Sequence, residues 1–270
     1  MGGGGLVAVR VLVRFAVREA VEIPGFTPSF VKSLLIMGDG GGLVKELFTR
    51  GGANKPLGIT PVMAGGRPIL SEGRVTLKPG RTYWVGVGAA GGEELVEAVP
   101  AAALNAFGSG VCETAGAEVE AVRLEEPPQA IPKEITVKTL TPAIIEALTA
   151  DGTQTLIESP TLRDILATPL RILGRVLWEA YGINIPTAWG WRIARHYAQT
   201  KSKTRTTTVN IGKGRKVRGV EGEWTFKATK LKPPKYVAAA LDKALKIAKA
   251  VGIGKSRGIG FGQVKIIVRR

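Results

Sequence analysis

The first half of the chain alternates between apolar runs typical of strands and apolar positions with the spacing of a helix. β-branched and other apolar residues dominate residues 6–15, where a strand is predicted, and helical spacing begins at Thr27, with Pro28 in the first turn. The predicted elements are a strand (6–15), a helix (27–37), a short helix (43–49), three strands (59–63, 74–77 and 82–87), a helix (93–106) and a strand (117–124). This order is close to β-α-β-β-α-β, the order of a ferredoxin-like unit.

The second half repeats this order after a proline-rich break. Pro127, Pro128 and Pro132 interrupt the chain, and we place a domain boundary there, between residues 1–126 and 134–270. The elements predicted after it are a strand (134–139), two helices (161–181 and 189–198), a β-hairpin, a helix (234–251) and a strand (263–268). The predicted fold class is α+β, with two tandem ferredoxin-like (RRM-like) domains.

A segment before the last helix combines cations, β-branched residues and glycines. Two strand-like runs, residues 204–211 and 216–227, flank a Gly212-Lys213-Gly214 turn, so a β-hairpin with cationic edges is predicted. Such a ribbon can follow an RNA backbone, because lysines and threonines suit phosphate oxygens. Trp224 and Phe226 either stack on bases or point into the core, and the period of a strand favours the core. The RNA-binding cations predicted here are Lys201, Lys203, Arg205, Lys213, Arg215, Lys216 and Arg218.

Five glycines and two cations lie between the last predicted helix and the last strand. A dinucleotide or P-loop site needs its glycines between a strand and a following helix, so the inverted order here excludes both. Glycine has no Cβ and allows the close approach of another chain, which predicts contact with a phosphate backbone. The alternative, a turn that only joins helix to strand, stays open. The RNA-binding residues predicted in this loop are Gly252, Gly254, Lys255, Arg257, Gly258, Gly260 and Gly262, with Lys255 and Arg257 at its tip.

The positive charge of the chain is concentrated in its last third. The chain has 38 Lys and Arg against 22 Asp and Glu, yet residues 192–270 alone hold 21 basic and 3 acidic residues, a net charge of +18. A field of one sign attracts polyanions, so nucleic acid is the expected partner. Lys243, Lys246 and Lys249 share one face of a helix and are interpreted instead as solvated surface charges.

The few cysteine and histidine residues and the hydropathy of the chain exclude several kinds of site and of membrane segment. Cys112 and His196 are the only residues of their kinds, so neither a disulfide within the chain nor a Cys/His metal cluster is expected, and no cofactor is predicted. No apolar run reaches the ~18 residues of a membrane helix. The glycine-rich start lacks the features of a signal peptide, so a soluble, cytoplasmic protein is expected.

Several segments of the second half resemble the CRISPR repeat-processing endoribonucleases, the sixth Cas family of the RAMP superfamily. The loop ending in Gly260-Phe-Gly-Gln-Val264 is similar to the family's C-terminal glycine-rich loop. The matching segments are residues 139–142 (Thr-Leu-Thr-Pro), 158–162 (Glu-Ser-Pro-Thr-Leu), 170–181, 213–222 and 252–264. The resemblance spans residues 134–270. It implies tandem ferredoxin-like domains and CRISPR repeat RNA, precursor and mature, as partner, with subunits of an effector complex or a second copy of the chain as further partners.

The resemblance also implies a metal-independent reaction, in which a ribose 2′-hydroxyl attacks the neighbouring phosphate and leaves a 2′,3′-cyclic phosphate. The family's general base is usually a histidine soon after the first long helix, but residues 43–55 contain none. Family members without this histidine are understood to position the strand and neutralise charge with cations. The catalytic candidates of that kind are Lys32, Lys45, Arg50 and Lys55, each of which is alternatively an ordinary surface cation. His196 lies in the other domain and is expected to pack a helix or bind phosphate.

Two functions agree with these residues. The first is an endoribonuclease that cuts CRISPR precursor RNA within each repeat, and the second is a non-catalytic RAMP subunit that holds crRNA in an effector complex. The missing histidine favours the second, whereas the complete pattern of the second domain favours the first, which we predict. A ribosome-associated basic protein does not account for two α+β units, and Asp151, Glu158 and Asp164 lie in no motif of a carboxylate-paired hydrolase.

Overall fold

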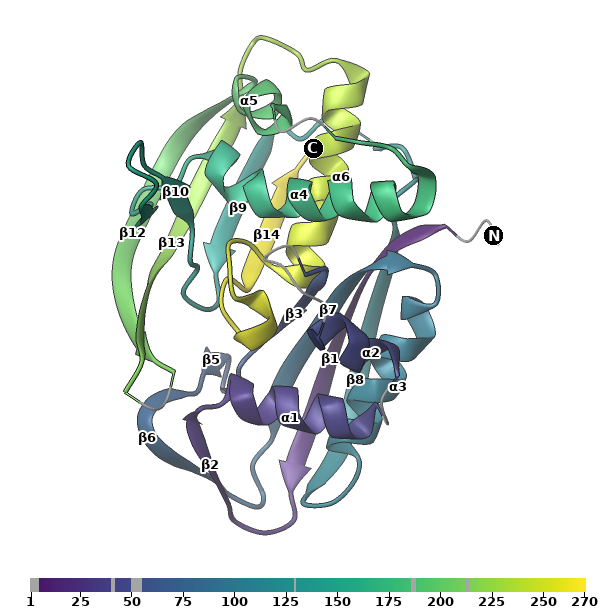
Figure 1. The fold of residues 1–270 in the computed structure, drawn as a ribbon, viewed down its shortest axis with the longest axis vertical. Helices are drawn as coiled ribbons and strands as arrows, with labels where there is room; N and C mark the ends of the chain where they lie inside the picture. Colours follow the sequence, from purple (N-terminus) through teal and green to yellow (C-terminus); the bar gives the residue numbers. More distant parts are fainter. Residues whose placement is uncertain (1–4, 40–41, 50–54, 129, 186–187, 212–213) are drawn as a thin grey trace.

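The computed structural model describes residues 5–39, 42–49, 55–128, 130–185, 188–211 and 214–270. Its two main sheets are antiparallel, and helices lie against each of them. In Figure 1 the first half of the chain, purple to blue, lies below the second half, green to yellow. The fold is α+β, as predicted.

The first sheet is built around a central strand that pairs with a long strand on each side. Its strands are β1 (Leu6–Val17), β3 (Leu57–Ile59), β4 (Met63–Ala64), β5 (Arg67–Pro68), β7 (Tyr83–Gly92) and β8 (Cys112–Arg123), in the order β5-β4-β7-β1-β8, with β3 also paired to β7. Val9, Val11 and Val13 of β1 are fully buried under α1 (Pro28–Gly38) and α3 (Leu95–Phe107). A long β-branched run therefore forms the central strand because one face is covered by two helices.

The second sheet has the same arrangement. Its strands are β9 (Glu134–Thr139), β12 (Tyr197–Asn210), β13 (Lys216–Ala228) and β14 (Val264–Arg269), in the order β12-β13-β9-β14, and its helices are α4 (Leu162–Tyr181), α5 (Trp189–Ala194) and α6 (Lys235–Val251). Trp224 and Phe226 of β13 are buried beneath these helices, so the prediction that they point into the core is confirmed. Both halves run β-α-β-β-α-β, counting β1-α1-β4-β7-α3-β8 and β9-α4-β12-β13-α6-β14.

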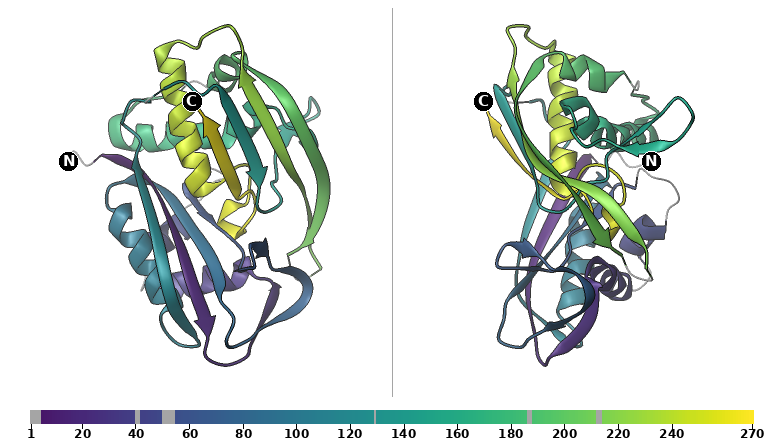
Figure 2. Two further views of the ribbon diagram at one scale, coloured as in Figure 1. Left: turned by 180° about the vertical axis from the view of Figure 1, so that it is seen from behind. Right: turned by 90° about the vertical axis from the view of Figure 1, so that its left-hand side faces the viewer.

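Helix α6 packs between the two halves and joins their cores. Ile247, Ala250 and Val251 share an apolar cluster with residues at the start of β1, the end of β7 and one side of α4. The backbones of α6 and β7 lie so close together that a Cβ on Gly88 would lie 1.8 Å from the carbonyl oxygen of Ala250. This close approach explains why glycine occupies that position in β7. The view from behind in Figure 2 shows α6 beside β1.

Several predicted elements differ from the structure in extent. The helix expected over residues 189–198 ends at Ala194, because the chain enters β12 at Tyr197. Three small pairings were missed: β2 (Val21–Phe26) with β6 (Leu70–Leu77), β10 (Glu146–Leu148) with β11 (Gln154–Leu156), and β4 with β5. All three are short or lie outside the main sheets, where the hydrophobic period is weakest.

The interpretation of the α6 lysines as solvated surface charges agrees with Lys249, whose side chain is 46% exposed, and is wrong for Lys246, whose side chain is 18% exposed. Lys246 donates a hydrogen bond of 3.2 Å to the carbonyl oxygen of Arg123, and Lys249 forms an ion pair with Glu120 of β8. Both therefore hold the second half against the first. No described helix is long and apolar enough to cross a membrane.

Candidate functional site

A cavity of about 300 Å³ opens where the first helices of the chain meet the glycine-rich loop. Helix α1 contributes Lys32, and α2 (Leu43–Thr49) contributes Phe48. The described residues that line it are Lys32, Phe48, Lys55, Lys255, Ser256, Arg257, Gly258 and Ile259. The tertiary structure thus places two of the four predicted catalytic cations, Lys32 and Lys55, beside the predicted RNA-binding loop.

Lys55 and Lys32 both contact Phe48 at the wall of this cavity. The Nζ atom of Lys55 donates a hydrogen bond of 2.5 Å to the carbonyl oxygen of Phe48, and Nζ of Lys32 lies 5.5 Å from the centre of the Phe48 ring. Desolvation, followed by the positive charge of Lys32, lowers the pKa of Lys55 from its ordinary value of 10.5. Lys55 therefore gives up its proton more readily than a lysine in water.

Lys255 reaches the cavity from the second half of the chain and is held by a small hairpin. Its ammonium group forms an ion pair with Glu146 of β10 and a hydrogen bond with the side-chain oxygen of Gln154 at β11. Its backbone N–H donates a hydrogen bond of 2.8 Å to the carbonyl oxygen of Ile144. The otherwise unexplained β10–β11 pair therefore fixes one cation at the edge of the cavity.

Arg257 does not lie at an exposed tip, and that part of the prediction is wrong. Its residue is only 2% exposed, and its guanidinium donates hydrogen bonds to the carbonyl oxygens of Gly254 and Lys55, the latter at 2.9 Å. Burial lowers the pKa of Arg257 to about 10. The side chain therefore ties the loop to the segment that carries Lys55, and Lys255 is the loop cation that retains solvent exposure.

The glycines of the loop are required by its packing on the protein itself. Gly254, Gly260 and Gly262 have positive φ angles of 69°, 88° and 68°. A Cβ on Gly260 would lie 2.5 Å from Cγ of Pro28, at the start of α1, and one on Gly262 would lie 1.9 Å from the carbonyl oxygen of Ile253. These contacts place the loop against α1, where Ser256, with φ of 60°, adds a hydroxyl group to the cavity.

The remaining catalytic candidates and the hairpin cations lie elsewhere. Lys45 is exposed on α2 and does not line the cavity, whereas Arg50 and the hairpin residue Lys213 fall outside the described residues. The hairpin cations within the described chain are all exposed: Lys201, Lys203, Arg205, Arg215, Lys216 and Arg218. Three of them are held in place by ion pairs, Lys201 with Glu223, Arg205 with Glu221, and Arg218 with Glu158.

His196 is buried at the start of the second sheet. It is 1% exposed, and its Nδ1 lies 2.8 Å from the carbonyl oxygen of Leu231, while Nε2 lies 3.4 Å from Nε of Arg195. Both ring nitrogens thus have partners within the second half of the chain. Of the two roles expected from the sequence, packing and phosphate binding, this buried setting favours packing.

Sequence reasoning missed three uncharged residues that line the cavity, Phe48, Ser256 and Ile259. Ser256 stands between Lys255 and Arg257, and its place in a glycine-rich run was a usable signal. Phe48 has no distinguishing signal, because a helical aromatic is most often part of the core. Among the described residues, no group of three or more His, Cys, Asp or Glu side chains is arranged to hold a metal ion.

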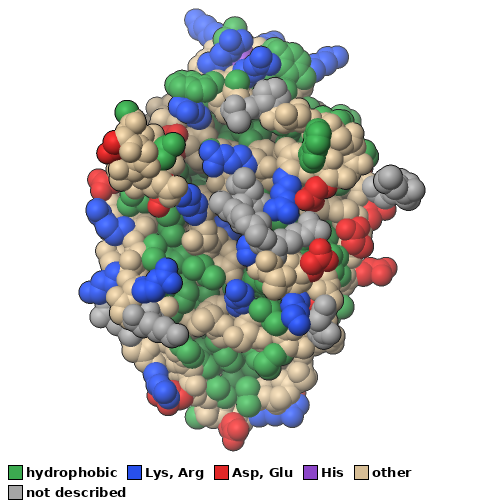
Figure 3. Space-filling model, in the orientation of Figure 1, with side chains coloured by type: hydrophobic (Ala, Val, Ile, Leu, Met, Phe, Trp, Pro, Cys, Tyr) green, Lys and Arg blue, Asp and Glu red, His purple; other side chains and the backbone are tan. Residues whose placement is uncertain are grey.

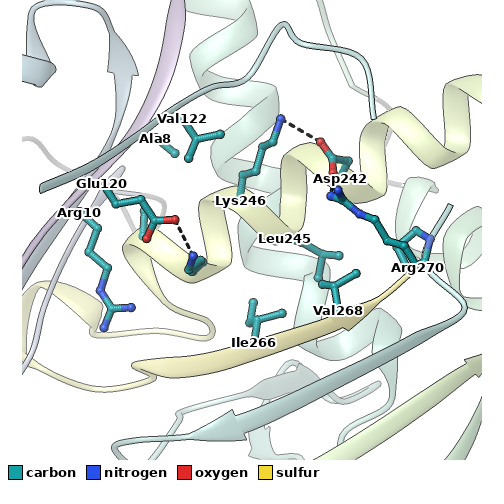
Figure 4. A pocket seen from close by; sticks show the side chains of 13 residues that line it. Ala8, Arg10, Glu120, Val122, Asp242, Leu245, Lys246, Ile266, Val268 and Arg270 are labelled. Atoms are coloured by element: carbon teal, nitrogen blue, oxygen red, sulfur yellow. Dashed lines mark hydrogen bonds and ion pairs between the residues drawn. The ribbon is translucent and has the colours of Figure 1, made fainter. Parts of the chain in front are cut away.

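A second cavity, of about 440 Å³, lies between α6, β14 and the strands β1 and β8 (Figure 4). Its lining mixes cations and carboxylates, with Lys246 paired to Asp242 and Arg10 close to Glu120. Burial lowers the pKa of Arg10, and the charge of Glu120 opposes that effect. This cavity belongs to the packing between the two halves.

Each half of the chain thus runs β-α-β-β-α-β, and the glycine-rich loop packs against α1 beside three lysines. Residues 137–264 match the family model of the CRISPR-associated endoribonuclease Cas6. The resemblance to this family that the sequence indicated is therefore confirmed over residues 137–264. A comparison of the sequence with curated proteins finds no match.

Solved structures share the fold along almost all of the chain. A Cas6 product complex gives a TM-score of 0.67 at 17% identity, covering 98% of this chain and 100% of that one. Thermus thermophilus Cas6 gives a TM-score of 0.63 at 16% identity, covering 99% of this chain and 100% of that one. A RAMP protein binding different RNA substrates gives a TM-score of 0.60 at 14% identity, covering 96% of this chain and 99% of that one. At these identities the likeness concerns the fold.

Proposed function

We propose that this protein is an endoribonuclease that cuts CRISPR precursor RNA within its repeats, by attack of a ribose 2′-hydroxyl on the adjacent phosphate. The observation that carries the proposal is the cluster of Lys32, Lys55 and Lys255 in one cavity at the glycine-rich loop. Three cations in a partly desolvated site suit a phosphate whose negative charge grows in the transition state. The likeness in fold to a RAMP protein binding different RNA substrates supports RNA as the ligand.

The cavity residues have the properties that this reaction needs. The 2′-oxygen loses its proton and attacks phosphorus, the bond from phosphorus to the 5′-oxygen breaks, and that oxygen takes up a proton. The products are a 2′,3′-cyclic phosphate and a 5′-hydroxyl. Lys55, with its lowered pKa, is our candidate for proton transfer, and Lys32 and Lys255 stabilise the phosphorane charge.

The exposed hairpin is proposed as the surface that positions the RNA. Replacing Lys203 and Lys216, both exposed on the long strands β12 and β13, with alanine is expected to weaken RNA binding. Each lost phosphate contact lowers the slope of log Kd against log salt by about 0.7 to 1 unit. Fluorescence anisotropy at several salt concentrations measures this slope. Arg81→Ala, an exposed cation of the first half, is the matched control, and equal slopes for all three variants would contradict the assignment.

The second candidate function is a non-catalytic RAMP subunit that holds crRNA in an effector complex. One observation favours it: no histidine is among the described residues that line the cavity. The same lysines and hairpin would then bind RNA without cutting it. Subunits of such a complex, or a second copy of the chain, would be the protein partners.

Incubation of the purified protein with its own genome's repeat RNA, in EDTA, tests the two functions against each other. We expect cleavage of the all-ribose RNA and none of an RNA with a single 2′-deoxy substitution at the cut, because the nucleophile is then missing. A cyclic phosphate end on the upstream product is expected as well. Tight binding of both RNAs without a cut would contradict the endonuclease and support the crRNA-holding subunit.

A further inference from the structure

A groove with an unusual lining runs along helix α4, apart from the lysine cavity. It has a volume of about 450 Å³ and lies between α4 and the residues Asn184, Ile185 and Gly190. Helices α1, α2 and α4 lie on the same side of the molecule, opposite the strands β1, β8 and β14 (Figures 1 and 2). A nucleic acid bound at the lysine cavity therefore has this groove on the same face.

The groove is cationic along its length. Arg163, Arg171 and Arg175 follow one another at intervals of eight and four residues, which places them in a row on one side of α4. None of the described lining residues is acidic, and only Arg175 has a carboxylate partner among the described ion pairs, Glu179 at 2.9 Å. Blue side chains gather over the middle of this face in Figure 3. The row is thus suited to a ligand with regularly spaced negative charges.

Two tryptophans stand exposed at the two ends of this row. Trp178, which lines the groove, is 62% exposed, and Trp191 on α5 is 61% exposed. The guanidinium of Arg163 lies 4.1 Å from the centre of the Trp191 ring, so this arginine offers a planar, cationic surface as well. Neither indole is needed for the core, and both leave a large flat face in solvent.

We propose that the α4 groove binds single-stranded RNA, with bases stacked on Trp178 and on the Arg163–Trp191 pair and with phosphates on Arg171 and Arg175. A single strand needs both planar groups and cations, because each nucleotide presents a base to stack and one negative charge. All the charged residues among the described lining are cations, which favours a polyanion over a folded protein partner. The inference rests on the proposed function only for the identity of the strand, which would be the unpaired RNA that leads to or from the lysine cavity.

A short oligonucleotide that cannot report cleavage tests this groove. The probe is a fluorescein-labelled RNA of ten uridines, and the variants are Trp178→Ala and Arg171→Glu, both at exposed positions that leave the core intact. Each is expected to raise the Kd about tenfold, because stacking of one base and the reversal of one charge each contribute on that scale. Arg81→Glu is the control, because it changes the net charge by the same amount at an exposed position in the first half. It is expected to leave the Kd within twofold of the native value.

Tryptophan emission supplies an independent readout. Titration with the oligouridine is expected to quench part of the native emission, and Trp178→Phe is expected to remove most of that quenching. A Kd for Trp178→Ala and Arg171→Glu within twofold of the native value, with unchanged quenching in Trp178→Phe, overturns the proposal. The same result is expected if the groove instead holds a protein. If the groove variants lose oligouridine binding while the native protein cuts no repeat RNA, the groove proposal stands and the endonuclease proposal fails.

Discussion

Replacing Lys55 with alanine is expected to slow RNA cleavage at least about 100-fold, while the Kd for an uncleavable 2′-deoxy RNA changes less than about threefold. Proton transfer by a positioned side chain contributes about 10² to 10⁴ in rate, and Lys55 is the cavity lysine whose pKa is lowered by its surroundings. Single-turnover cleavage measures the rate, and anisotropy measures binding. Lys45→Ala is the control, because Lys45 lies on neighbouring α2 but is exposed and outside the cavity.

The pH dependence of cleavage tests the same role. A base must be neutral to accept a proton, so the rate is expected to rise with pH and level off above the pKa of Lys55, below the ordinary lysine value of 10.5. Lys32→Met removes a positive neighbour, which raises the pKa of Lys55 and moves the inflection to higher pH. An unmoved inflection in this variant, or cleavage at the native rate by Lys55→Ala, would remove Lys55 from proton transfer.

The second large effect is expected at Gly262, where alanine should lower the free energy of unfolding by at least about 3 kcal/mol. The residue has φ of 68°, which costs an L side chain about 1 to 2 kcal/mol, and its Cβ would lie 1.9 Å from the carbonyl oxygen of Ile253. That contact is with backbone, so the loop itself must move, and the hydrogen bond of 2.8 Å between Ile253 N–H and the Gly262 oxygen would be strained. Urea unfolding measures the loss.

Gly80→Ala separates the two contributions. Gly80 has φ of 74°, and a Cβ there would meet no atom within 4 Å, so only the backbone conformation penalises alanine. The difference between the two variants therefore reports the packing of the glycine-rich loop. Equal losses of unfolding free energy in both variants would show that the loop can shift to accommodate a Cβ. Glycine at position 262 would then be needed only for its positive φ angle.

Local sequence determined most of the secondary structure. Helix α2 and strand β9 have the bounds that the sequence predicted, and α4 and α6 begin within one residue of the predicted starts. Each of these segments buries one face, so the spacing of its apolar residues follows directly from which side chains are buried. The basic hairpin was predicted for the same reason, with burial of Trp224 and Phe226 following from a period of two.

The site could be predicted only in outline. The sequence indicated a cationic loop and a set of lysines in the first half, but it could not show which lysines meet the loop. Lys32 and Lys55 line the cavity, while Lys45, equally plausible by position, faces solvent. The choice depends on the orientation of α2 against α1, and that orientation is set by packing rather than by local spacing.

The sequence by itself therefore determined the fold class, the excess of positive charge in the last third and the resemblance to Cas6. Only the tertiary structure decided that Arg257 is buried and holds the Lys55 segment, 202 residues away, and that Lys255 is paired with Glu146. Only the tertiary structure placed three arginines and Trp178 along one groove. The physical reason is the same in each case: desolvation and partner choice depend on which distant side chains share a surface, whereas secondary structure depends on neighbours along the chain.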